Sequence, residues 1–161
     1  MKSFLTMRRW PQFVVGFAAL VWLVPVTVGD LNLDPKAIHI SSPDQIQWKE
    51  GNGSANAVLY GDPTKPGLYI NLTKWYPHHN SRPHYHPNDR YITVMKGTWW
   101  VATGTNYDPD HFVPVKQGSF VVHTGKEVHY DGAKDEEVVL EMVGMGPATS
   151  ISAEKGNAET H

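Results

Sequence analysis

Apolar and polar residues alternate in short runs over most of the chain, which is the pattern of half-buried β-strands. In the clearest run, 68–75, three apolar side chains share one face of the predicted strand, and three side chains of greater polarity share the other. These two sets are Leu68, Ile70 and Leu72, and Tyr69, Asn71 and Thr73. Further runs rich in β-branched and aromatic residues predict strands at 46–49, 57–60, 91–95, 98–102, 112–115, 119–123 and 137–143. No long amphipathic helix is predicted after residue 29, so the pattern favours an all-β sandwich or barrel.

The first 29 residues differ from the rest and have the features of an export signal. Three basic residues precede an apolar run at 13–24, and small residues follow it. We expect a signal peptide over 1–29 that is cleaved on export to the periplasm or the extracellular space. The alternative is an uncleaved membrane anchor, although the apolar stretch 13–28 is short for a span and contains Pro25.

The remaining chain divides into three segments. Residues 30–44 carry two prolines without clear periodicity, so we expect an extended lead-in. Residues 45–147 hold the predicted strands and form one domain. Residues 148–161 are small and polar, and they are expected to form a disordered tail.

Composition and charge exclude several classes of function. The chain has no cysteine, so a metal would need histidine, carboxylate or water ligands. Removing residues 1–29 takes away three of the 14 basic residues and none of the 16 acidic ones, which leaves a net charge near −5. No basic patch remains, so nucleic acid is not an expected partner, and no membrane span is expected after signal cleavage.

A pair of histidines in the stretch 83–97 is the main chemical signal. In a β-strand, His84 and His86 point to the same face, roughly 7 Å apart, and both can reach one metal ion. His129, in the later stretch 118–132, is a candidate third ligand from another strand. The alternative interpretation is a group of surface histidines in a proline-rich loop.

With strands and histidines placed, the chain resembles the cupin superfamily. The first cupin motif, G-x5-H-x-H-x3,4-E-x6-G, is matched in spacing by His84, His86 and Gly97, with Arg90 at the usual Glu position and no opening glycine. The second motif, G-x5-P-x-G-x2-H-x3-N, is matched more loosely. Gly118, Gly125 and His129 fit it with single-residue shifts, His123 stands at the proline position, and no Asn follows.

The resemblance implies a single jelly-roll barrel with one metal ion bound by His84, His86 and His129. It also implies frequent homodimerisation. It does not imply a reaction, because this fold carries many unrelated activities.

Arg90 is the informative departure, because a guanidinium cannot bind a cation. Three interpretations are open. Arg90 faces the site and binds an anionic substrate group, or it turns outwards and pairs with an acid such as Asp89, or a register shift makes Asp89 the fourth ligand. Without a carboxylate, copper or iron are the preferred metals, and zinc and nickel also suit imidazole ligands better than manganese does.

Other residues are candidates for the surroundings of the site, each with a structural alternative. His78 and His79 lie in the preceding loop, as residues at the mouth of the site or plain surface histidines. Tyr130, beside His129, is a candidate for the cavity mouth, and His123 for the cavity or a structural role. Either Trp99 or Trp100 is expected in the core, and the other faces a neighbour or a ligand. Glu141, among apolar residues, either supports a ligand or faces outwards.

The leading functional hypothesis is an exported metal-dependent oxidoreductase that uses O2 or peroxide on a small organic molecule or a carbohydrate. Copper-dependent oxidative cleavage of a polysaccharide is a specific version of it. The alternatives are a non-redox isomerase or lyase in which the metal is a Lewis acid, and a binding protein for sugars or small molecules without turnover.

Overall fold

A computed structural model describes residues 33–34 and 36–154, and the predicted signal peptide lies outside this part of the chain. The chain divides into two compact units, Met1–Ile40 and Ser41–His161. In the described part of the first unit, a turn forms where the backbone N–H groups of Ala37 and Ile38 donate to the carbonyl of Asp34, both at 3.0 Å. Within the described residues, no helix has the length and apolar character needed to cross a membrane.

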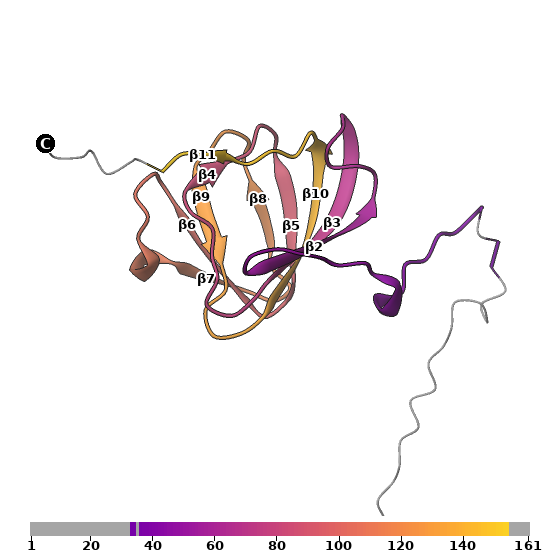
Figure 1. Ribbon diagram of the computed structural model, residues 1–161, viewed down its shortest axis with the longest axis horizontal. Helices are drawn as coiled ribbons and strands as arrows, with labels where there is room; N and C mark the ends of the chain where they lie inside the picture. Colours follow the sequence, from indigo (N-terminus) through magenta and orange to yellow (C-terminus); the bar gives the residue numbers. More distant parts are fainter. Residues whose placement is uncertain (1–32, 35, 155–161) are drawn as a thin grey trace, which may run out of the picture. The chain divides into compact units, whose positions relative to one another are not determined.

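The second unit consists of two antiparallel sheets (Figure 1). The larger sheet has the order β1 (Lys49–Glu50), β2 (Ser54–Tyr60), β3 (Gly67–Trp75), β10 (Val138–Gly146), β5 (Arg90–Lys96) and β8 (Phe120–His123). The smaller sheet has the order β11 (Ile151–Ser152), β4 (His84–Tyr85), β9 (His129–Gly132), β6 (Thr98–Thr103) and β7 (Val113–Lys116). Two short 3-10 turns, η2 (Pro43–Gln45) and η3 (Pro109–His111), complete the described elements. The prediction of an all-β fold is confirmed.

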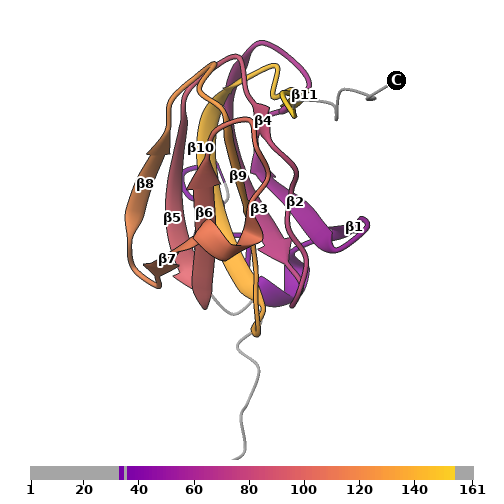
Figure 2. The same cartoon turned by 90° about the vertical axis from the view of Figure 1, so that its left-hand side faces the viewer.

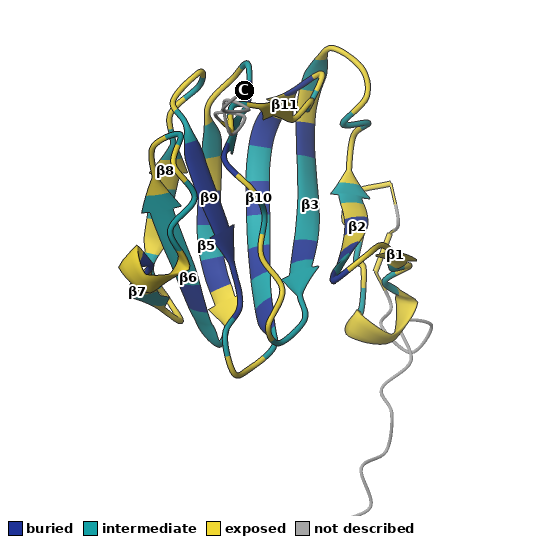
Figure 3. Ribbon diagram, turned by 60° about the vertical axis from the view of Figure 1, so that its left-hand side comes forward, coloured by how far each residue is buried: buried dark blue, intermediate teal, exposed yellow. Residues whose placement is uncertain are grey.

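Strand β10 lies at the centre of the larger sheet, between β3 and β5. It pairs with β3 along its whole length, from Val138 opposite Trp75 to Gly146 opposite Gly67. Its residues alternate between the two faces, which appears in Figure 3 as bands of buried and half-buried colour. Such a strand has no free edge, so its backbone groups are paired on both sides.

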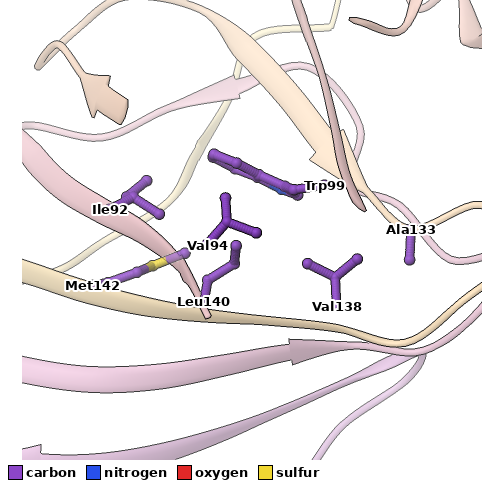
Figure 4. Close-up of a cluster of buried hydrophobic side chains, with 7 residues drawn as sticks. All are labelled: Ile92, Val94, Trp99, Ala133, Val138, Leu140 and Met142. Atoms are coloured by element: carbon purple, nitrogen blue, oxygen red, sulfur yellow. The ribbon is translucent and has the colours of Figure 1, made fainter. Parts of the chain in front are cut away.

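The core occupies one end of the space between the sheets. Seven buried side chains form it: Ile92, Val94, Trp99, Ala133, Val138, Leu140 and Met142 (Figure 4). Burial of each large aliphatic side chain in this group stabilises the fold by about 1.5–3 kcal/mol. The inward positions at the other end are polar, including Arg90 on β5 and His123 on β8. The apolar end therefore holds the sheets together and leaves the polar end free to form a site.

The last strand corrects the expected boundary of the tail. The sequence placed a disordered tail at 148–161, but Ile151 pairs with Tyr85 and Ser152 with His84 to form β11 on β4, side by side in Figure 2. The N–H of Ala153 also donates to the carbonyl of Pro83 at 2.9 Å. Ile151 and Ser152 lie within a small, polar segment, and they form a strand because β4 is available to pair with them. Residues 155–161 lie outside the described part.

Candidate functional site

Three histidines meet at the polar end of the second unit. His84 on β4 stands directly opposite His129 on β9, and His86 follows two residues after His84. The ring centroids are 4.6 Å apart for His84 and His129, and 4.8 Å apart for His84 and His86. One ligand nitrogen from each ring lies within 4.8 Å of the others. Directly opposed residues of an antiparallel pair are close neighbours, so the pairing of β4 with β9 creates the cluster.

Backbone carbonyls fix the orientation of all three rings. A carbonyl oxygen only accepts, so each Nδ1 that bonds to one carries the proton and each Nε2 keeps its lone pair. The acceptors are the carbonyls of Arg82 for His84 at 2.8 Å, Thr149 for His86 at 2.8 Å and Glu127 for His129 at 3.1 Å. This is the outer hydrogen bonding that orients imidazole ligands toward a metal.

The surroundings of the buried Nε2 of His129 indicate whether these residues suit a metal. It has no hydrogen-bond partner among the described residues, although an unpaired buried polar atom is costly. A metal ion shared with His84 and His86 would satisfy it. The donor set of three neutral imidazoles is also one that transition metals accept, so the residues fit a mononuclear metal site.

Arg90 faces into this site from β5. Its Nη1 lies 2.9 Å from Nε2 of His86. Among the described residues, no carboxylate forms an ion pair with it. Burial lowers the pKa of Arg90, while Tyr69 and Asp131 act in the opposite direction. The structure thus supports the inward interpretation over pairing with Asp89, whose carboxylate instead accepts from the N–H of Gly125 at 2.7 Å.

A buried carboxylate that the sequence analysis missed lies beneath the histidines. Asp131 is 5% exposed and accepts hydrogen bonds from the indoles of Trp75 at 3.1 Å and Trp99 at 2.9 Å. The hydroxyl of Ser81 donates to its other oxygen at 3.3 Å. Asp131 shares the inward face of β9 with His129, and this two-residue spacing was the available signal.

These groups line one cavity of about 650 Å³. The histidines lie on the smaller sheet, and Arg90 and His123 come from the larger one. Strands β2 and β3 contribute a further polar group consisting of Asn56, Asn71 and Thr73. The more polar face of β3 therefore points inwards, while Leu68 on the opposite face is 48% exposed. The cavity has the size of a small-molecule site.

Burial favours the neutral form of His86, His123 and His129. It is the main cause that lowers the pKa of His86 to about 3, with the positive charge of Arg90 acting in the same direction. The pKa of His123 falls to about 4 and that of His129 also falls, again mainly through burial. Neutral imidazoles are the form that binds metal ions.

Of the other predicted residues, His123 is the one that joins the site. Its ring centroid lies 3.8 Å from that of His129 and 5.2 Å from that of Trp99. It lines the cavity, but it does not belong to the cluster of three possible ligands.

The remaining candidates lie away from the cavity. Tyr130 is buried on the opposite face of β9, where its hydroxyl accepts from the N–H of Asp108 at 3.1 Å. His78 and Trp100 line a second, smaller cavity of about 220 Å³. His79 is exposed, with Nδ1 2.9 Å from the carbonyl of Pro77. Glu141 occupies an outward position of β10, between the inward Leu140 and Met142. None of these five residues lines the larger cavity.

Comparison with known proteins identifies the fold but not a reaction. No protein-family model and no curated sequence matches the chain. The polyketide cyclase RemF from Streptomyces resistomycificus matches with a TM-score of 0.62 and 12% identity, over 74% of this chain and 88% of that one. A cupin-2 domain from Rhodospirillum rubrum matches with a TM-score of 0.56 and 14% identity, over 76% and 82%. A cupin-superfamily sugar phosphate isomerase from Silicibacter pomeroyi matches with a TM-score of 0.55 and 18% identity, over 70% and 80%.

Proposed function

The chain has the cupin fold, and from this premise we propose that it is an enzyme that holds one transition metal through His84, His86 and His129. The observation that carries the proposal is the convergence of three oriented imidazoles, with the Nε2 of His129 buried and unpaired among the described residues. The substrate is a small molecule with an anionic group, bound in the cavity of about 650 Å³.

The donor set favours copper or iron, with zinc, nickel or manganese as alternatives. A metal held there would supply either electron transfer to O2 or peroxide, or Lewis acidity toward a bound oxygen atom. We propose the redox version, an oxidoreductase, as the first to be tested. Oxidative cleavage of a polysaccharide and dioxygenation of a small organic molecule are its two specific forms.

The residues of the chain contribute binding and orientation. Arg90 presents a guanidinium to the cavity beside His86, and it suits a carboxylate or another planar anion. Asp131 is bonded to two indoles and thereby fixed in place, so its negative charge lies below the histidines at a constant position. His86 and Asp131 are buried and Arg90 is half-buried, which strengthens their electrostatic interactions relative to those in water.

Metal content of the purified chain tests the proposal, by elemental analysis together with EPR. We expect about one equivalent of metal per chain, and its loss in His84→Ala and His129→Ala. His111→Ala is the matched control, because this exposed histidine pairs with Asp108 in η3. Copper or iron would favour the oxidoreductase, and zinc the Lewis-acid enzyme. Absence of bound metal after reconstitution with each ion would contradict both.

One observation favours a second candidate, a binding protein without turnover. Arg90 donates to the Nε2 of His86 and so keeps its guanidinium in the cavity, where it could hold an anion without a metal. In that case anions would bind equally well before and after treatment with a chelator. Product formation separates the non-redox isomerase or lyase from this binding protein.

We also propose that the chain is exported and forms a homodimer. The basic and apolar start of the sequence supports export, and detection of the processed N-terminus would test it. Exposed apolar side chains on β5 and β8 supply a surface for a second copy: Tyr91, Met95, Phe120 and Val122. Sedimentation velocity would test the dimer, and a monomer at all concentrations would contradict it.

A further inference from the structure

Three side chains on β2 and β3 form a directed chain of hydrogen bonds inside the larger cavity. Asn56 and Thr73 stand opposite each other in the β2–β3 pair. The hydroxyl of Thr73 donates to Oδ1 of Asn56 at 2.7 Å, and Nδ2 of Asn71 donates to the same hydroxyl at 3.2 Å. The hydroxyl also lies 3.7 Å from Sδ of Met142, but a thioether is a weak acceptor, so its one proton goes to Asn56. The amide nitrogen of Asn71 therefore faces Thr73, and its Oδ1 faces away.

The Oδ1 atom of Asn71 is left without a partner. It is buried and accepts no hydrogen bond from the described residues, although Asn71 lines the cavity. An unpaired buried acceptor is unfavourable, and a donor from a bound molecule would satisfy it. The amide nitrogen is already used by Thr73, so the vacant group presented to a ligand is an acceptor.

Arg90 lies on the same inner surface as Asn71. On the larger sheet, Arg90 pairs with Gly144, and Gly144 pairs with Tyr69. Asn71 follows Tyr69 by two residues and thus faces the same way. Gly144 leaves room for the phenol of Tyr69 to cross β10 toward Arg90, since an added Cβ would lie 2.7 Å from the Tyr69 hydroxyl. One molecule can therefore meet a cation and a neutral acceptor in the same cavity.

We propose that Asn71 Oδ1 binds a hydroxyl group of the substrate while Arg90 binds its anionic group, so that the substrate is a small hydroxylated organic acid. This inference rests on the proposed function, because it takes the anion at Arg90 from there. A hydroxyl suits this acceptor better than an ammonium group does. An ammonium group would call for a carboxylate partner as well. The one carboxylate among the described lining residues, Asp131, is already bonded to Trp75 and Trp99.

Paired acids that differ only in hydroxyl groups test the proposal. Calorimetry on chelator-treated protein, which avoids chelation of the metal by the probes, compares lactate with propionate, malate with succinate, and gluconate with hexanoate. In at least one pair we expect the hydroxylated acid to bind about tenfold more tightly, because only it satisfies the buried acceptor. Equal affinity within every pair would mean that water alone occupies Asn71, and this would overturn the proposal.

Variants locate the effect and separate it from the proposed function. Asn71→Leu is expected to remove the difference within the pair, whereas Asn106→Leu, the same change at an exposed position, is expected to keep it. Metal content of Asn71→Leu should equal that of the wild type. If no acid binds at all, the anion role of Arg90 fails and this proposal fails with it. If acids bind without discrimination, only the hydroxyl site is overturned, and the wild-type comparison decides this even if Asn71→Leu does not fold.

Discussion

Nη1 of Arg90 lies 2.9 Å from Nε2 of His86, the nitrogen that would coordinate a metal. One lone pair cannot serve both partners, so the guanidinium must move away when a metal binds. An anion that draws Arg90 toward itself would free His86. Metal and anion would then strengthen each other's binding, since such coupling is reciprocal.

Arg90→Met is therefore expected to bind Zn²⁺ more tightly than the wild type does, by about tenfold, because a competing donor and a nearby positive charge are both removed. Competition with a chromophoric chelator measures this affinity. Arg82→Met is the control, since Arg82 lines the same cavity but pairs with Glu154. Unchanged or weaker zinc binding in Arg90→Met would show that Arg90 does not compete for His86.

The carbonyl of Thr149 orients His86, so the C-terminal strand is expected to affect the metal site. A chain that ends at Pro147 lacks this carbonyl and β11. We expect its metal affinity to fall about tenfold or more, which is the usual effect of losing an outer hydrogen bond. A chain that ends at Glu154 keeps both features and should bind metal as the full chain does. Equal affinity of the two truncated chains, with circular dichroism showing both folded, would contradict the role of Thr149.

Asp131→Ala is expected to destabilise the fold by about 3 kcal/mol, because it leaves the buried indole N–H groups of Trp75 and Trp99 without their acceptor. Urea denaturation measures the change in the free energy of unfolding. Asp135→Ala, at an exposed position, should change it by less than about 0.5 kcal/mol. Similar values for the two variants would mean that the indoles find other partners.

The metal-free protein is expected to lose stability in mild acid. The pKa of His86 is lowered to about 3 and that of His123 to about 4, from 6.5, so the unfolded chain takes up protons first as the pH falls. The free energy of unfolding should therefore decrease from pH 6.5 down to about pH 3 and level off below.

Urea titrations of the chelator-treated protein across this range measure the loss. His123→Phe should reduce it, whereas His111→Ala, which changes an exposed histidine, should not. A free energy of unfolding that stays constant between about pH 6.5 and pH 5 would contradict the prediction.

Local patterns of apolar and polar residues were sufficient to predict the long strands. Every predicted strand overlaps an observed one, although the first, 46–49, does so only at Lys49 of β1. Periodicity reports the environment of a strand along its own length, so β3, β5 and β10 were recognisable. The two-residue spacing of His84 and His86 likewise indicated a shared face before any partner strand was known.

The short strands and the rest of the cavity depend on contacts distant in sequence. Strands β4 and β11 have two residues each, and they exist because they pair with β9 and with each other. The inward role of Asn71 was hidden because its alternating strand has its more apolar face outside. Inside and outside are reversed there because the inner surface at that end of the unit is a polar cavity.

The position of β10 has a consequence for the order in which the protein is made. Residues 138–146 join β3 to β5 at the centre of the larger sheet, yet they follow every other strand of that sheet along the chain. Until they emerge from the ribosome, the two halves of that sheet have no strand to connect them. The carbonyl that orients His86 emerges later still. A nascent chain therefore cannot complete either the larger sheet or the metal site until residues 138–149 have emerged.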